Sequence, residues 1–166
     1  FMKTLFIESK FIGKISVPKK IIEELPKTIA LFFTIQFIDS LEDVKKDIEA
    51  TGRTVKLMKG KHTKYMGQIY GCNLEKFEGV DAYFYIGDGL FHPKALALGN
   101  DKPIHIWNPV SEEYSVMDRE AVYEELHRQK AAFSRFLLAN KVGVLVTTKP
   151  GQSYLKYALK LKEKYP

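Results

Sequence analysis

A nearly continuous apolar run, TIALFFTIQFI at residues 28–38, constrains the fold of this chain more than any other feature. A strand covered on one face alternates apolar and polar residues. A strand covered on both faces is apolar almost throughout, as in a parallel sheet between two layers of helices. The run therefore predicts a buried strand inside a mostly parallel sheet.

The segments around this run alternate between strand and helix patterns. Residues 40–52 predict an amphipathic helix with Ser40 as its N-cap and Gly52 at its C-terminal end, and Asp118 caps a second, longer helix. Strands are predicted near 4–10, 28–38, 54–58, 82–87, 103–107 and 142–148, and helices at 19–25, 40–52, 89–99, 118–140 and 155–165. This alternation predicts an α/β fold with three layers, αβα, and a mostly parallel sheet of the flavodoxin-like or a related doubly wound type.

The predicted elements suggest a division of the chain near residue 140. Residues 1–140 are expected to form the α/β domain that carries the single cysteine. Residues 141–166 are interpreted as the opening strand and helix of a further domain, or as an added edge strand and helix. Because an unpaired strand exposes backbone groups, the strand at 142–148 is expected to pair with the domain's own sheet or with a second copy.

Composition narrows the class of protein. The formal net charge of +6 allows an acidic partner, but the lysines are scattered over polar faces, so no direct nucleic-acid binding is expected. The sequence has no apolar run near the roughly 18 residues of a membrane span, and its start does not resemble a signal peptide. A single cysteine cannot form an internal disulfide bond, which favours a reducing compartment and predicts a cytoplasmic protein.

Three loops follow predicted strands, at the sheet edge where doubly wound folds bind ligands. They span residues 60–72, 87–93 and 148–153. Glycines allow close backbone approach to a ligand, and a helix N-terminus offers free N–H groups to an anion. The candidate site residues are His62, Lys64, Tyr65, Gln68 and Cys72 in the first loop, Gly87, Gly89 and His92 in the second, and Lys149, Gly151 and Gln152 in the third.

Each candidate also has a purely structural interpretation. The glycines of the second loop are compatible with a tight strand-to-helix turn, His92 with packing against the following helix, and residues 148–153 with an ordinary turn. Cys72 is either a small buried apolar residue, a thiolate nucleophile or one ligand of a metal centre, and its polar loop favours exposure. Because the sequence contains no Walker loop, GxGxxG, HExxH or CxxC motif, no catalytic residue is assigned.

Four motifs in one order carry a resemblance to a known family. They are YMGQIYGCN, VDAYFYIGDGLFHPKALAL, DKPIHIWNP and VGVLVTTKPGQS. Together, and with similar spacing from about residue 4 to the end, they resemble the diphthamide synthases of archaeal type, the 2-(3-amino-3-carboxypropyl)histidine synthases. In the family motif GQ-x-x-GC, Cys72 matches the cluster cysteine of the middle domain.

The resemblance implies a three-domain α/β transferase in which each domain contributes one cysteine. The three thiolates of such an enzyme hold a [4Fe-4S] cluster whose open iron binds S-adenosylmethionine. Cleavage of a C–S bond yields a 3-amino-3-carboxypropyl radical, which attacks a histidine of translation elongation factor two. The candidates in the second and third loops then lie on the cofactor side, and Lys64, Tyr65 and Gln68 lie in the loop near the cluster.

This chain departs from the family pattern in its cysteine content. It resembles the middle domain plus the start of the third, and one thiolate cannot hold the family's cluster. By itself the chain is therefore expected to bind no complete cluster and to be inactive, and to need the missing domains, a second subunit or a homodimer. Phe1 ahead of Met2 and the abrupt end favour a piece of a longer enzyme.

Two other functions remain open at this point. The chain is alternatively a non-catalytic accessory or binding module derived from the family. It is also compatible with an unrelated α/β domain that binds a small anion at residues 87–92. Whether the chain is an enzyme is left undecided by its sequence.

Overall fold

The computed structural model describes residues 5, 7–72, 74–147 and 153–164. The chain divides into two compact units, residues 8–127 and residues 1–7 with 128–166. The elements, in chain order, are α1 (Lys19–Glu24), β1 (Thr28–Phe33), the 3₁₀ helix η1 (Ile35–Ser40), α2 (Leu41–Glu49), β2 (Thr54–Leu57), β3 (Ala82–Ile86), α3 (Phe91–Gly99), β4 (Ile104–Asn108), β5 (Glu113–Met117), the 3₁₀ helix η2 (Arg119–Val122), α4 (Tyr123–Leu137) and α5 (Leu155–Lys164).

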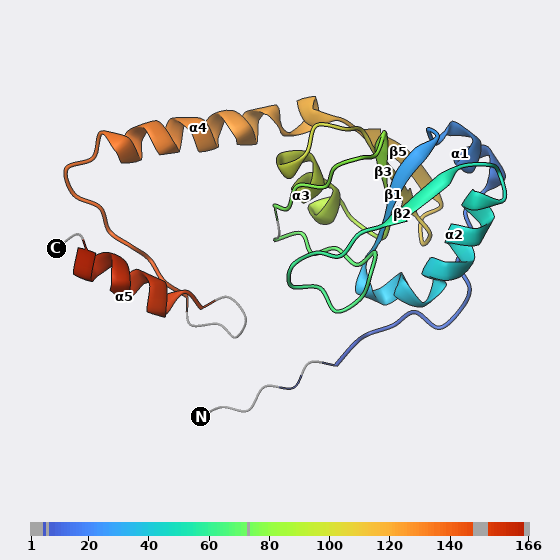
Figure 1. Cartoon of the computed structure of the whole chain (residues 1–166), viewed down its shortest axis with the longest axis horizontal. Helices are drawn as coiled ribbons and strands as arrows, with labels where there is room; N and C mark the ends of the chain where they lie inside the picture. Colours follow the sequence, from blue (N-terminus) through green and yellow to red (C-terminus); the bar gives the residue numbers. More distant parts are fainter. Residues whose placement is uncertain (1–4, 6, 73, 148–152, 165–166) are drawn as a thin grey trace. The chain divides into compact units, whose positions relative to one another are not determined.

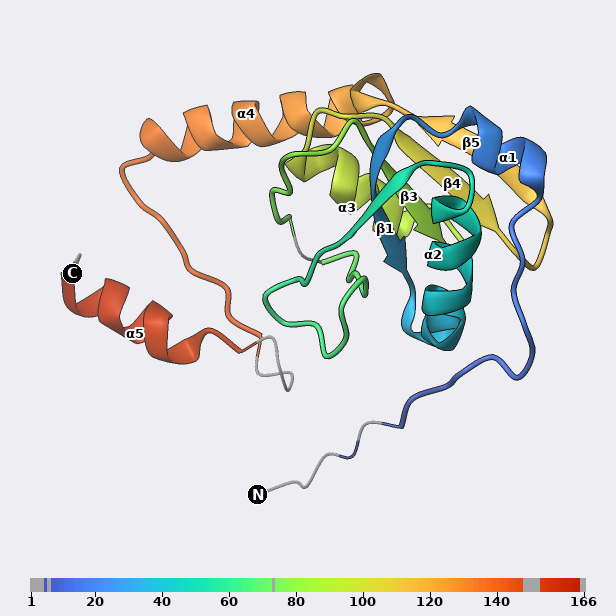
Figure 2. The ribbon, with the colours of Figure 1, turned by 45° about the vertical axis from the view of Figure 1, so that its right-hand side comes forward.

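The five strands of the described residues form one sheet in the order β2-β1-β3-β4-β5 (Figures 1 and 2). β2, β1, β3 and β4 are mutually parallel, and β5 runs antiparallel to β4. The predicted α/β fold with a mostly parallel sheet is confirmed. Because the connections from β1 go first to β2 and then across to β3, the strand order reverses between β1 and β3, which is where such folds bind ligands.

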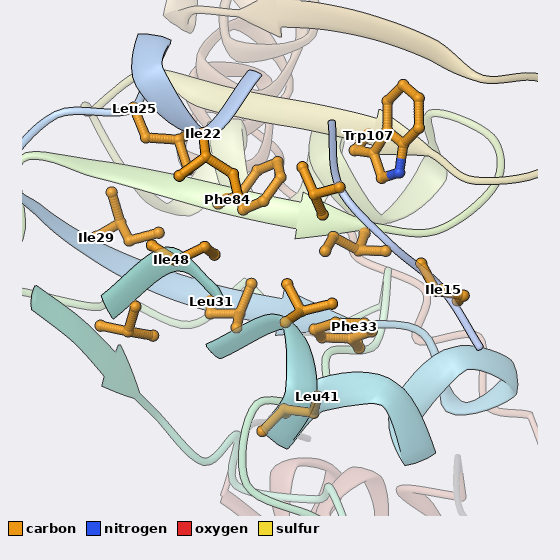
Figure 3. Packing of buried hydrophobic residues seen from close by; sticks show 14 of the residues in the cluster. Ile15, Ile22, Leu25, Ile29, Leu31, Phe33, Leu41, Ile48, Phe84 and Trp107 are labelled. Carbon is orange, nitrogen blue, oxygen red and sulfur yellow. The ribbon is translucent and has the colours of Figure 1, made fainter. Parts of the chain in front are cut away.

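One face of the sheet is covered by α1 and α2. Figure 3 shows Ile22 of α1, Leu25 just after α1 and Ile48 of α2 close to side chains of β1 and β3. The strands contribute every second residue to this face, as the pleat requires. The strand residues of this cluster are Ile29, Leu31, Phe33, Val55, Ala82, Phe84, Ile86 and Trp107.

The opposite face of the sheet is covered by α3 and η2. Leu96 and Ala97 of α3 and Val122 of η2 are buried against the alternate strand residues, among them Phe32 and Tyr85. β1 and β3 are therefore buried on both faces, which explains why their sequences are apolar throughout. The αβα layers of the prediction are confirmed.

The apolar run at 28–38 covers two elements and not one long strand. β1 ends at Phe33, and the Thr34 N–H donates to the Ile86 carbonyl at 3.2 Å. The chain then turns into η1, whose Phe37 and Ile38 return to the core. The predicted strand was too long because a buried 3₁₀ turn and a buried strand are both apolar.

The ends of α2 were predicted with mixed success. Ser40 occupies the N-cap position of α2, as predicted, but its side chain makes no capping hydrogen bond. It is also the last residue of η1, and its Oγ accepts a hydrogen bond from the Ile15 N–H at 3.4 Å. Gly52 has φ +82° just beyond the helix, as a C-terminal stop requires. Asp118 is confirmed as a cap, since its carboxylate accepts from the Glu120 and Ala121 N–H groups, but the element that it caps is η2. The long helix predicted at 118–140 begins only at Tyr123, as α4.

The predicted strand at 4–10 is wrong over its described residues. Residues 7–11 form no strand. The Phe11 N–H donates to the Gln36 carbonyl at 2.7 Å, and side chains make the other contacts. Lys10 pairs with Asp39 at 2.6 Å, and the Phe11 ring lies edge-on to Phe37. Alternating apolar and charged residues are compatible with an edge strand and equally with an extended segment anchored by its side chains.

Nearer the C-terminus, one strand was missed and one was predicted where the structure assigns none. β5 was missed, although it pairs with β4 from Ile104↔Met117 to Asn108↔Glu113. Its sequence, EYSVM, is short and largely exposed, so it carries little hydrophobic signal. Over 142–147, the described residues of the strand predicted at 142–148, the structure assigns no strand, and Val142, Val144 and Leu145 are exposed. Pairing of this segment with a second copy stays a prediction.

None of the helices in the described part of the chain combines the length and the apolar character that a membrane crossing needs.

Burial of two histidines predicts a pH dependence of stability. Burial lowers the pKa values of His92 and His105 below their ordinary value of 6.5. Below about pH 6.5 the unfolded chain therefore binds more protons than the folded one, and stability falls until both histidines protonate in the folded state. We expect a lower melting temperature at pH 5.5 than at 7.5, a smaller difference in His105→Gln, and the full difference in His62→Gln, which changes an exposed loop residue. A melting temperature independent of pH over this range would contradict the prediction.

Candidate functional site

The carboxyl ends of β1 and β3 bring two of the three predicted loops to one edge of the sheet. After β2, the chain returns to β1, and Gln68 forms a parallel bridge with Phe33. The Phe33 N–H donates to the Gly67 carbonyl at 2.7 Å, and the Ile69 N–H donates to the Phe33 carbonyl at 3.1 Å. The loop at 60–72 is therefore fastened to the end of the central strand.

Gly67 and Gln68 build this loop from inside. Gly67 has φ +70°, and a β-carbon there would overlap the Leu41 side chain. The buried Gln68 accepts, at its Oε1, hydrogen bonds from the Lys64 and Tyr65 N–H groups at 2.9 and 3.1 Å. Gln68 thus organises the loop backbone, a role that its prediction as a loop residue near the site did not include.

Lys64 and Tyr65 face the N-terminal segment. Lys64 Nζ donates to one carboxylate oxygen of Glu8 at 2.8 Å, and the Tyr65 hydroxyl donates to the other at 3.0 Å. The hydrogen bond from Lys64 is the main cause that lowers the pKa of Glu8, and the same bond raises the pKa of Lys64. These are exposed pairs, which are worth little individually. They fasten residue 8 to the loop and leave the Lys64 charge partly neutralised.

Cys72 lies in a turn at the end of this loop, and its side chain is exposed. The alternative of a small buried apolar residue is therefore wrong. An exposed thiol contributes little to the core, and it is free to bind a metal or to react. The expectation that the sulfur is accessible is confirmed.

The second loop, at 87–89, joins β3 to α3 through a tight turn. A β-carbon at Gly87 would overlap the Tyr85 hydroxyl and lie 2.9 Å from the Thr34 methyl group. Gly89 has φ +64° and no neighbour that a β-carbon would meet within 4 Å. Gly87 is therefore required by close packing and Gly89 by backbone conformation. Contact of either glycine with a cofactor stays a prediction.

His92 lies in the first turn of α3 and contacts Tyr85. The two rings are stacked with centroids 5.9 Å apart, and His92 Nδ1 lies 3.4 Å from the Tyr85 hydroxyl, which donates to the Asp88 carbonyl at 3.1 Å. Burial lowers the pKa of His92 and raises that of Tyr85. A neutral imidazole that is half-buried, next to the turn, is suited to hydrogen bonding more than to pairing with an anion.

Phe91 joins the two loops, a contact that the sequence did not predict. A β-carbon on Gly71 would overlap the Phe91 ring, so the ring lies directly on the backbone of the residue before Cys72. Phe91 is the first residue of α3 and remains 65% exposed. The structure thus brings Cys72 close to the beginning of α3.

The third predicted loop is only partly described. Lys149, Gly151 and Gln152 lie outside the described residues, so their assignment to the cofactor side stays a prediction.

Two buried polar groups at the same edge have no hydrogen-bond partner. Within the described part of the chain, they are the Thr34 hydroxyl, directly after β1, and the Trp107 indole nitrogen in β4. Both side chains are at most 5% exposed. A buried polar atom without a partner costs about 1–3 kcal/mol and calls for a specific explanation. Nothing in the sequence distinguished Thr34 from the other residues of its apolar run.

A valine at position 34 tests the cost of that hydroxyl. Thr34→Val removes an unpartnered polar atom and keeps the shape, so we expect unchanged or higher stability, by up to about 1 kcal/mol in urea unfolding. Thr63→Val is the matched control, because the buried Thr63 hydroxyl donates to the Gly60 carbonyl at 2.9 Å, and its loss should cost about 1 kcal/mol. Equal destabilisation by both variants would show that Thr34 has a partner in solution.

Cys72 is the sole cysteine of the sequence, and its thiol lies on an exposed loop. In the part of the chain that the structure describes, no three His, Cys, Asp or Glu side chains are grouped so that they could hold a metal ion.

Comparisons with known proteins give a consistent result. Residues 2–166 match the family model of the diphthamide synthesis proteins. The 2-(3-amino-3-carboxypropyl)histidine synthase of Pyrococcus horikoshii is 31% identical over 143 residues, which cover 84% of this chain and 41% of the relative. The synthase of the same name from Methanocaldococcus jannaschii is 29% identical over 91% of this chain and 42% of its own length.

Solved structures agree with the sequence relatives. The crystal structure of Dph2 from Pyrococcus horikoshii with a 4Fe-4S cluster is similar to this chain with a TM-score of 0.68 and 29% identity, over 86% of this chain and 43% of that one. The chain therefore spans less than half the length of the relatives that it matches. On the evidence of the family model, the relatives and the shared fold, the chain belongs to the diphthamide synthesis family.

Proposed function

We propose that this chain provides the middle, cysteine-bearing domain of a diphthamide synthesis enzyme, and that residues 141–166 contribute to a further domain of it. The observation that carries the proposal is the exposed thiol of Cys72 at the carboxyl edge of the sheet. A protein with the same fold over 86% of this chain was crystallised with a 4Fe-4S cluster. An exposed loop cysteine suits a cluster that forms between domains.

The reaction follows from the product named in the relatives, a histidine that carries a 3-amino-3-carboxypropyl group. We propose S-adenosylmethionine as the donor of this group and a histidine of translation elongation factor two as its acceptor. The cluster, when bound and reduced by an external electron donor, would supply the electron that breaks a C–S bond of S-adenosylmethionine, with the rest of that molecule leaving as a thioether. We propose that this reaction takes place in the cytoplasm.

The residues of this chain hold and orient the reactants. Cys72 provides one of the thiolates that iron–sulfur clusters require, and the others come from further domains or a second subunit. The free N–H groups at the start of α3 suit the carboxylate of the donor, with Gly89 and His92 beside them. Lys149, Gly151 and Gln152 are proposed to complete this side.

A second candidate is a non-catalytic accessory module of the same family. This sequence contains one cysteine, and a role that uses only the fold and its surface requires no complete cluster. Such a module would keep the fold and present its surface to a partner. Cys72 would have no part in that role. The experiment below separates the two candidates.

The test is a chimera with a full-length relative. The segment of the Pyrococcus horikoshii synthase that matches this chain is replaced by this chain, and the protein is reconstituted with iron and sulfide without oxygen. We expect the visible absorption of a 4Fe-4S cluster and transfer of the 3-amino-3-carboxypropyl group to elongation factor two, measured by mass spectrometry.

Two controls make the result decisive. The unmodified synthase establishes full activity, and circular dichroism with thermal melting establishes that the chimera is folded. A folded chimera with neither cluster nor transfer would contradict the enzymatic proposal and support the accessory module.

A further inference from the structure

The ring of Phe91 packs closely against the backbone, although most of its side chain is exposed. It lies on the backbone of Gly71, close enough that a β-carbon at that position would overlap the ring atoms Cδ1 and Cε1 and lie 2.9 Å from Cγ. At the same time 65% of the side chain is exposed. Phe91 therefore contributes little to the hydrophobic core, but it makes a specific contact with the turn that contains Cys72.

The contact is selective for glycine at position 71. Any other residue there would require the ring or the turn to move, since the shortest distances are below those of real β-carbons. The φ of Gly71 is not among the positive values of the chain's glycines, so backbone conformation does not demand glycine. The ring of Phe91 is therefore the physical reason for glycine beside Cys72.

We propose that Phe91 is a positioning residue for Cys72: its ring holds the Gly71–Cys72 turn against the start of α3. What the sulfur then ligates rests on the proposed function. The positioning itself depends only on contacts within this chain. It can be measured without a cluster.

The chain is well suited to this measurement because Cys72 is its single cysteine. A nitroxide spin label attached to it reports on the turn without any other substitution. In electron paramagnetic resonance spectra at room temperature, we expect Phe91→Ala to shorten the rotational correlation time of the label several-fold. Phe91→Leu, which keeps an apolar side chain on Gly71, should restore most of the wild-type spectrum. Leu90→Ala, an exposed neighbour of similar size, should leave it unchanged.

A double substitution tests the contact itself. Gly71→Ala should mobilise the label, because its β-carbon would overlap the Phe91 ring. In the Phe91→Ala background the same alanine meets no ring, so it should add nothing. The rate of Cys72 alkylation by iodoacetamide should follow the same pattern in four proteins. These are the wild type, Phe91→Ala, Gly71→Ala and the variant with both substitutions. Thermal melting should change little in Phe91→Ala, because the side chain is mostly exposed.

The results separate this proposal from the proposed function. A label that is equally mobile in wild type and Phe91→Ala, or a Gly71→Ala effect that is the same in both backgrounds, would overturn the positioning role. If the label responds as expected but the chimera assembles no cluster, Phe91 still positions Cys72 and the enzymatic proposal fails instead.

Discussion

Replacing Cys72 by alanine in the chimera is expected to reduce transfer of the 3-amino-3-carboxypropyl group by more than 100-fold. Loss of a residue that merely orients a metal ligand typically costs about 10–100-fold, so loss of a ligand itself should exceed that range. The melting temperature should fall by no more than about 2 °C, because Cys72 is exposed and such substitutions change stability by about 0.5 kcal/mol or less.

Two further variants sharpen this prediction. Cys72→Ser keeps the size of the side chain but has no thiolate, so it should lose the cluster absorption as fully as alanine does. Lys61→Ala changes an exposed residue of the same loop and should retain both cluster and transfer. A Cys72→Ala chimera that still transfers the group would remove Cys72 from the proposed cluster.

The sequence predicted the sheet well where burial is complete. β1 and β3 are covered on both faces, so their apolar runs identified them and the parallel arrangement together. The same reasoning overextended the first run to residue 38, because η1 is buried too. Where one face is exposed, as in β5, the hydrophobic signal was too weak to show a strand.

The sequence predicted which loops form the candidate site, but not which side chains contact one another there. Because the loops of Cys72 and His92 follow strands of a parallel sheet, they were expected at one edge, and the structure has them there. The sequence did not reveal that Gln68 holds the loop backbone, that Phe91 covers Gly71, or that the Thr34 hydroxyl lacks a partner. Each of these depends on which side chains meet across the fold, and such meetings leave no local pattern.

Gly67→Ala is expected to destabilise the chain by about 2–5 kcal/mol, the largest stability effect among these variants. Two costs add. Alanine in the left-handed region, at the φ of +70° that Gly67 has, costs about 1–2 kcal/mol. Its β-carbon would also overlap the Leu41 side chain, and crowding in a packed core costs about 1–3 kcal/mol more.

Gly52→Ala separates the two costs, because it shares the first and lacks the second. Gly52 has φ +82°, but a β-carbon there would meet no atom within 4 Å, so only about 1–2 kcal/mol should be lost. Urea unfolding of both variants gives the difference directly. Since the Gly67 carbonyl accepts from Phe33 and its N–H donates to the Met58 carbonyl, the larger loss should come with faster alkylation of Cys72 in the folded state. Equal losses in the two variants would mean that Leu41 moves aside freely, and that the loop is not held at Gly67.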